Sequence, residues 1–242
     1  MSLQPESTSD VIMILRDDIT TIKTLRFMAY QPSPGLNIRL AATQPGLHAE
    51  LGRLGEILPD SEALIENINA LISSHLASID AIRQMIGETA IESQREDAAD
   101  ISVLAESFDN KWLDETIYRL PSHLALAICS TCMLEDGTVA HLPMMDFRSA
   151  AKSTSANFIE GLLKAMGQEH GFILNSGNSY HFYGTRLLSE SEWVKFLATS
   201  LLFAPFVDSR YVAHRLRAGR CNLRLRRSGS LKPSDPVVVR AF

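Results

Sequence analysis

Few cysteines and no long apolar run limit the classes of protein open to this sequence. Its 242 residues include three cysteines, an odd number that does not suggest a disulfide framework and fits a reducing cytoplasm. No run of about 18 apolar residues occurs, so neither a transmembrane helix nor a membrane partner is expected. Residues 1–10 are polar and lack an apolar core, so no secretory signal is expected either. The sequence therefore predicts a cytoplasmic protein.

Charge is spread unevenly along the chain, although the net charge is only −5. Residues 1–120 carry 9 Lys and Arg against 19 Asp and Glu, for a net charge of −10. Residues 121–242 carry 14 against 9, for a net charge of +5. Hydrophobic residues make up 45% of the sequence, which is ordinary for a globular protein with a real core.

A basic stretch lies near the C-terminal end and contains no acidic residue between positions 209 and 232. A localised basic stretch on a mildly acidic protein indicates a site for an anion. Two other interpretations stay open: a solvated face, or arginines that pair with the acidic first half. The eight basic residues are Arg210, Arg215, Arg217, Arg220, Arg224, Arg226, Arg227 and Lys232.

The first half of the chain reads as mainly helical. Apolar residues recur at helical spacing over residues 10–28 and again over residues 47–94, where Pro59-Asp60-Ser61 divides two helices. Residues 93–109 are acidic and weakly periodic, which fits either a helix or a linker. Since no catalytic motif is visible here, residues 1–119 are expected to form a helical scaffold or a docking region for a protein partner.

The second half, residues 120–242, reads as an α+β domain. The order of elements predicts an antiparallel or mixed sheet with helices packed on one face. Asp136-Gly137 is expected to form a hairpin turn, and Ser189 with Glu192 has the pattern of a helix capping box. Strands are expected at 123–130, 138–147, 171–174, 179–183, 222–226 and 237–240, and helices at 150–168 and 189–203.

Asp146, His181 and Asp208 stand at equivalent ends of successive strand units. Each has a structural explanation when taken alone, because such an aspartate can cap a helix and such a histidine is usually packed in the core. Together with the basic stretch they supply carboxylates for a divalent cation and arginines for phosphates. Phosphoryl or nucleotidyl transfer requires this combination.

On these residues the second half resembles the catalytic core of the archaeo-eukaryotic primase (primase–polymerase) superfamily. That family shows an apolar strand ending in Asp-x-Asp/Glu, then a small residue followed by x-His after a Ser-Gly turn, then an apolar residue followed by Asp. The matching segments are Met145-Asp146-Phe147-Arg148, Ser179-Tyr180-His181 and Val207-Asp208.

The resemblance implies an RRM-like, primase-type sheet core and a role in DNA replication, repair or defence. It implies that Asp146 and Asp208 bind metal, Mg²⁺ or Mn²⁺, and that His181 contacts nucleotide phosphate, which makes these three the expected catalytic residues. No cofactor is certain from the sequence. Nucleotide or nucleic-acid phosphate is expected to be bound by Arg148, Ser179, His181, Arg210, Arg215, Arg224, Arg226 and Lys232.

One position departs from the family pattern, because Arg148 stands where a second acid is expected. Two-metal catalysis uses several carboxylates around ions roughly 3.5–4 Å apart, and a guanidinium here removes a ligand and repels a metal. The same guanidinium matches phosphate oxygens. Glu135 or Asp136 entering the site instead is an open alternative.

Three functions follow, in order of preference. The first is a primase-like domain that binds nucleotide or nucleic-acid phosphate, with nucleotidyl transfer weak or lost. The second is an active primase or polymerase that uses Asp146 and Asp208 with a divalent metal. The third is a non-enzymatic subunit of a larger DNA-acting complex. Cys129 and Cys132 are expected to be buried thiols in a strand, in preference to zinc ligands.

Overall fold

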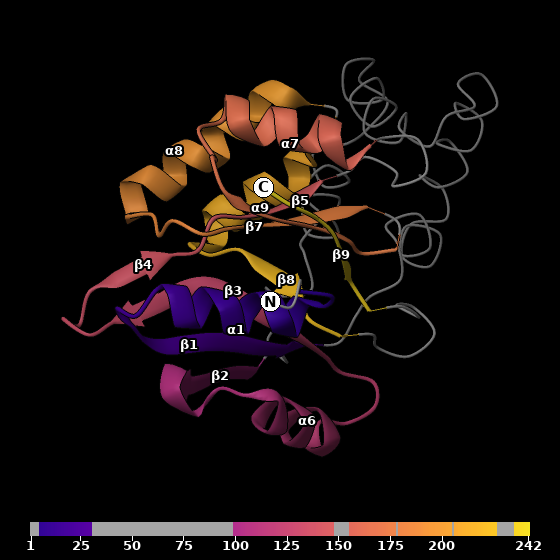
Figure 1. Ribbon diagram of the computed structural model, residues 1–242. Coiled ribbons are helices and arrows are strands. Elements are labelled where there is room, and N and C mark those ends of the chain that lie inside the picture. The colour runs from indigo at the N-terminus through magenta and orange to yellow at the C-terminus, as the bar shows by residue number, and fades with distance from the viewer. Residues whose placement is uncertain (1–4, 31–98, 148–154, 178, 205, 227–234) are drawn as a thin grey trace, which may run out of the picture. The chain divides into compact units, whose positions relative to one another are not determined.

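The structure, a computed structural model, describes residues 5–30, 99–147, 155–177, 179–204, 206–226 and 235–242. These residues form five α-helices and two antiparallel sheets, so the expected α+β class is confirmed (Figure 1). They belong to one unit, made of residues 1–32 and 91–242. The helices expected over residues 47–94 lie outside the described residues. No helix in the described segments is long and apolar enough to cross a membrane.

A five-stranded antiparallel sheet joins segments from both sides of the boundary expected near residue 120. Its order is β2-β1-β3-β4, and β8 also pairs with β3. The strands are β1 (Ile22–Tyr30), β2 (Ala99–Leu104), β3 (Ala125–Leu134), β4 (Val139–His141) and β8 (Asn222–Arg224).

The helix expected over residues 10–28 is wrong in its second half. Helix α1 (Thr8–Asp18) begins at the capping box of Ser7 and Asp10, and Ile22–Tyr30 then form strand β1. This strand lies between β2 and β3 and is buried at most positions. A strand buried on both faces has no alternating pattern, so its apolar residues were read as a continuation of the helix.

The single strand expected over residues 138–147 is two strands in two different sheets. Gly137 makes the expected turn with a φ of 84°, and β4 then pairs with β3. After Leu142-Pro143 the chain enters β5 (Met144–Phe147), which pairs with β7 in the second sheet. Proline lacks an N–H and cannot continue a ladder, so the sheets separate at this point.

The second sheet is four-stranded and antiparallel with the order β5-β7-β6-β9, so the described residues form two sheets where the sequence predicts one. Its other strands are β6 (Gly171–Asn175), β7 (Tyr180–Gly184) and β9 (Val237–Ala241). Side chains alternate between the two faces of a strand. Met144, Tyr183 and Phe172 therefore share one face, and Met145, Phe182 and Ile173 share the other.

Capping side chains fix the helix starts. Ser155 accepts a hydrogen bond from the N–H of Phe158, and Ser189 forms the expected capping box with Glu192. Both caps satisfy N–H groups that a helix start leaves without partners. The helices are α6 (Asn110–Arg119), α7 (Ala156–Ala165), α8 (Glu190–Ser200) and α9 (Ser209–Ala218), with short 3₁₀ turns η2 (Ala105–Ser107) and η3 (Leu201–Phe203).

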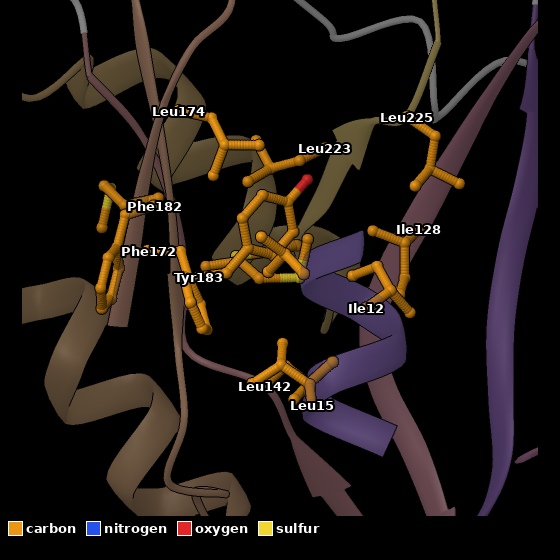
Figure 2. Close-up of a cluster of buried hydrophobic side chains, with 14 of the residues drawn as sticks. Ile12, Leu15, Ile128, Leu142, Phe172, Leu174, Phe182, Tyr183, Leu223 and Leu225 are labelled. Atoms are coloured by element: carbon orange, nitrogen blue, oxygen red, sulfur yellow. The ribbon is translucent and has the colours of Figure 1, made fainter. Parts of the chain in front are cut away.

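The core gathers side chains from α1 and both sheets in one hydrophobic cluster (Figure 2). The four-stranded sheet contributes residues from both of its faces, and Tyr183 lies in the middle of the cluster. Burying each large apolar side chain contributes roughly 1.5–3 kcal/mol. The labelled members are Ile12, Leu15, Ile128, Leu142, Phe172, Leu174, Phe182, Tyr183, Leu223 and Leu225.

Candidate phosphate-binding site

Asp146 and His181 face each other on neighbouring strands. They are register partners in the antiparallel pair of β5 and β7, and Leu174 continues the row on β6. Residues directly opposite each other in such a pair have Cβ atoms about 4.5–5.5 Å apart on one face of the sheet. The aspartate and the histidine therefore lie side by side, although 34 positions separate them in the chain.

Asp208 continues the same row on the other side of Asp146. An isolated antiparallel bridge joins Phe147 to Val207. Asp146 directly precedes Phe147 and Asp208 directly follows Val207, so this bridge brings the backbones of the two aspartates close together. Asp208, Asp146 and His181 thus form what we call the carboxylate–histidine row. The metal and catalytic roles expected for the three residues remain predictions.

Asp208 also caps a helix, which is the structural role the sequence allowed it. Its Oδ1 accepts a hydrogen bond from the N–H of Tyr211 at 3.3 Å. Its carbonyl accepts from the N–H of Val212 at 3.1 Å. These bonds fix the carboxylate at the start of α9, half-buried beside the row.

The turn between β6 and β7 holds the carboxylate of Asp146 in place. Ser179 Oγ donates to Asp146 Oδ1 at 3.1 Å. Ser176 closes the turn, because its N–H donates to the carbonyl of Ser179 at 2.9 Å and the two hydroxyls lie 3.0 Å apart. Gly177 has a φ of 106°, a conformation that side chains other than glycine rarely adopt. The expected Ser-Gly turn thus positions both Ser179 and Asp146.

Arg224 brings a buried positive charge to this turn. It lies on β8, is 6% exposed, and donates from Nη2 to the carbonyl of Ser176 at 3.0 Å. Burial lowers the pKa of its guanidinium, and Tyr30, Asp235, Tyr183 and Asp146 oppose that shift. Because an arginine stays protonated in proteins, Arg224 places a permanent cation within electrostatic reach of Asp146.

Tyr183 and Ser176 belong to the same neighbourhood but are not among the metal and phosphate ligands that the sequence predicts. Tyr183 is two residues beyond His181 on β7 and so shares its face; it is fully buried. Burial raises its pKa, with Arg224 lowering it and Asp146 raising it further. The two-residue period from His181 is the signal that points to Tyr183, whereas nothing in the sequence points to the carbonyl of Ser176.

Two other described arginines of the basic stretch form ion pairs within the chain. Arg220 forms a two-pronged ion pair with Asp100, both distances 2.8 Å, and Arg226 pairs with Asp114 at 3.0 Å. Both aspartates come from the acidic first half of the chain. For these two arginines the structure agrees with the interpretation that the basic stretch pairs with that half.

Arg215, which was expected to bind phosphate, is fully buried beside α9's own side chains. It donates to Asn222 Oδ1 and lies 5.2 Å from the ring centre of Tyr211. The arrangement places its charge inside the fold. Arg148 and Lys232 fall outside the described residues, as does the side chain of Arg210.

The donor set at the row suits a hard divalent cation only in part. Asp146 and Asp208 offer carboxylate oxygens, the ligands that Mg²⁺ prefers, and Mg²⁺ commonly takes its remaining ligands from water and substrate phosphates. Within the described ranges no three His, Cys, Asp or Glu side chains are grouped to hold a metal ion. The described residues therefore fit one carboxylate-bound ion better than a two-metal centre.

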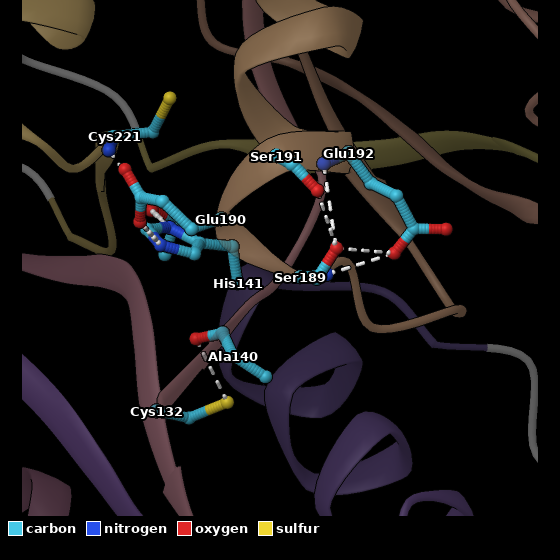
Figure 3. A network of polar contacts seen from close by, with 9 residues as sticks. Cys132, Ala140, His141, Ser189, Glu190, Ser191, Glu192 and Cys221 are labelled. Carbon is cyan, nitrogen blue, oxygen red and sulfur yellow. Dashed lines mark hydrogen bonds and ion pairs between the residues drawn. The ribbon is translucent and has the colours of Figure 1, made fainter. Parts of the chain in front are cut away.

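A second polar network is centred on His141 of β4 and includes Glu190 of α8 (Figure 3). His141 is 1% exposed; its Nε2 lies 2.7 Å from Glu190 Oε2 and its Nδ1 lies 3.3 Å from Ser130 Oγ. The Ser130 hydroxyl also accepts from the N–H of Cys221 at 2.9 Å. Ser130, His141 and Glu190 contact one another in series, but Ser130 is fully buried. The network therefore joins β3, β4 and α8 and does not face a substrate.

The three cysteines are buried free thiols, which confirms that expectation for Cys129 and Cys132. Burial raises the pKa of Cys129 to about 11 and that of Cys132 to about 12. Thiols with such pKa values are poor nucleophiles and poor metal ligands at neutral pH.

Comparison with known protein families identifies a match, which includes these residues. No curated protein and no solved structure matches this chain. A family model for the AEP-like domain, described as archaeo-eukaryotic primase 1D-like, matches residues 104–236. The match covers more than half of the 242 residues and includes the whole carboxylate–histidine row. The chain therefore belongs to the archaeo-eukaryotic primase 1D-like family.

Proposed function

We propose that the carboxylate–histidine row binds a phosphate group of a nucleotide or a nucleic acid, with nucleotidyl transfer weak or lost. The observation that carries the proposal is that Asp146 lies directly opposite His181 on neighbouring strands, with Asp208 next to the bridge that joins Val207 to Phe147. Arg224 is within electrostatic reach of the same place. Histidine, serine and arginine all donate hydrogen bonds to phosphate oxygens.

The electrostatics of the row make binding depend on cations. Two carboxylates beside a phosphate repel it, so the phosphate needs positive charge to offset them. Arg224 supplies one such charge, and a divalent ion on Asp146 and Asp208 supplies more. Asp146 and Asp208 would hold a Mg²⁺ or Mn²⁺ ion, which would supply positive charge to the phosphate, and Ser179 and His181 would orient the phosphate.

Weak or lost transfer follows from the number of carboxylates. Two-metal transfer needs several carboxylates to hold both ions, and the described residues bring two to the row. Arg148 stands where the family's first motif has its second acid, and its guanidinium contributes to phosphate binding and repels a second ion. Arg210 and Lys232 remain proposed phosphate ligands on the same basis of charge.

The test is a titration of labelled nucleotide and single-stranded DNA into the full chain, with and without Mn²⁺. We expect His181→Ala and Arg224→Ala to weaken binding, and Arg224→Ala to lower the slope of log K against log salt by about 0.7–0.9. Arg119→Ala is the matched control, since Arg119 lies on the surface with a side chain 78% exposed. Wild-type affinity in both site variants would refute the proposal.

The variant Asp146→Asn distinguishes the contribution of a metal ion to phosphate binding from the contribution of Arg224. Asparagine keeps an acceptor for the Ser179 hydroxyl but removes the charge that holds a cation. We expect this variant to lose the Mn²⁺ dependence of binding while its metal-free binding stays equal to the wild type or becomes stronger. Metal-dependent binding that survives in Asp146→Asn would show that the ion is held elsewhere.

A second candidate function is active nucleotidyl transfer, which the adjacent register of Asp146 and Asp208 favours. Its test is primer synthesis on a single-stranded template with Mg²⁺ or Mn²⁺. Nucleotide incorporation by the wild type that is lost in Asp146→Ala would show that the domain is an active nucleotidyltransferase. The absence of incorporation with either metal would count against it.

A further inference from the structure

Two aromatic side chains form an exposed pair at the end of β5. The rings of Phe158 and Phe206 are 4.8 Å apart with an interplanar angle of 64°. Phe158 is 41% exposed and Phe206 is 37% exposed. A tilted aromatic pair is favourable in itself and leaves ring surface open on its outer side.

The pair is held at a fixed place beside the carboxylate–histidine row. Val207, the next residue after Phe206, is 2% exposed and bridged to Phe147 of β5. The N–H of Phe206 donates to the carbonyl of Phe203 at 2.9 Å. Phe206 and Asp208 are two residues apart, so their Cα atoms are separated by at most about 7 Å. A ligand bound at Asp208 would therefore lie near Phe206.

We propose that the Phe158–Phe206 pair stacks an unpaired nucleobase of a single strand whose phosphate is bound at the row. This inference rests on the proposed phosphate site and adds the form of nucleic acid that the site accepts. Every base offers a π-face to an aromatic ring, which makes such stacking tolerant of sequence. The bases of a duplex are stacked on one another, so a single strand is preferred over the same sequence in a duplex.

The test compares two labelled strands of about 12 nucleotides, oligothymidylate and an abasic strand of equal length, in the full chain at one salt concentration. The wild type binds oligothymidylate more tightly than the abasic strand. Phe206→Ala and Phe158→Ala weaken oligothymidylate binding about tenfold, the effect of a typical lost base stack, and leave abasic binding unchanged. Phe206→Trp, which keeps a ring, retains the preference.

Tyr118→Ala is the matched control, because Tyr118 is a 91% exposed aromatic on α6 and its loss should change neither affinity. Equal binding of both strands by the wild type, or equal weakening of both in Phe206→Ala, overturns base stacking while the phosphate site stands. Binding of neither strand by the wild type removes the phosphate site as well. A dimer that Phe206→Ala dissociates, with the preference for bases intact, would assign the pair to self-association and overturn the proposal.

Discussion

His141 should contribute more to stability than any exposed histidine, because three interactions meet on its buried ring. The ring stacks on Trp193 with centroids 4.5 Å apart and an interplanar angle of 18°, which is worth about 1 kcal/mol. Its two nitrogens contact Glu190 and Ser130 at 2.7 and 3.3 Å, worth about 1 kcal/mol each at most once the exposure of Glu190 is discounted. His141→Ala is therefore expected to cost about 3 kcal/mol, before any cavity term.

The assay is urea unfolding followed by far-UV circular dichroism, with thermal melting as a second measurement. For a chain of this size about 3 kcal/mol corresponds to a fall in Tm of about 6–12 °C. His141→Phe keeps a ring against Trp193 and should cost less than His141→Ala. His123→Ala is the control, since His123 is exposed. A cost below about 1 kcal/mol for His141→Ala would refute the reasoning.

Three further predictions concern pH, backbone packing and thiol reactivity. Burial lowers the pKa of His141 from its ordinary 6.5, with Glu190 opposing the shift. The unfolded chain therefore binds the proton more tightly, so the stability from neutral His141 is fully present above about pH 6.5 and is lost as the pH falls through the lower folded pKa. The gap in unfolding free energy between wild type and His141→Phe should narrow over that range, and a constant gap would contradict it. Gly171→Ala should destabilise by about 1–3 kcal/mol, because a Cβ there meets the Phe182 ring at 2.4 Å and the Tyr183 carbonyl at 2.7 Å. Gly161→Ala, in α7 with nothing within 4 Å, should instead stabilise by about 0.5–1 kcal/mol, so the two variants should shift the urea midpoint in opposite directions. Iodoacetamide should label the native chain slowly and the urea-unfolded chain fast, because burial raises the thiol pKa to about 11, 12 and 11; rapid native labelling would exclude buried thiols at Cys129, Cys132 and Cys221.

Features that depend on neighbouring residues could be predicted from the sequence. The capping box of Ser189 and Glu192 starts α8 as expected, because a cap requires only residues three positions apart. Its hydrogen bonds, with the Ser189 N–H first and then Arg186, lower the pKa of Glu192 to about 2. The turn at Gly137 and the turn at Gly177 followed equally from the need for a positive φ.

Features that depend on distant pairing could not be predicted in this way. Strand β1 lies between β2 and β3 and is buried at most positions, which removes the alternation that identifies a strand, so its sequence resembles a helix. The division between β4 and β5 depends on which sheet each pairs with, and Pro143 was the only local sign of it. The arginines were read as one cluster, although Arg220 and Arg226 pair with acids more than a hundred positions away.

Asp208 can cap a helix and bind a metal ion at the same time. Asp208 caps α9 through one carboxylate oxygen, and that hydrogen bond also fixes the direction of its charge beside Asp146. Asparagine caps a helix about as well as aspartate, whereas alanine costs about 1 kcal/mol at such a position. Asp208→Asn should therefore keep wild-type stability in urea and lose Mn²⁺-strengthened phosphate binding, while Asp208→Ala loses both. If Asp208→Asn keeps full metal-dependent binding, the carboxylate serves only as a cap, and the row loses one of its two proposed metal ligands.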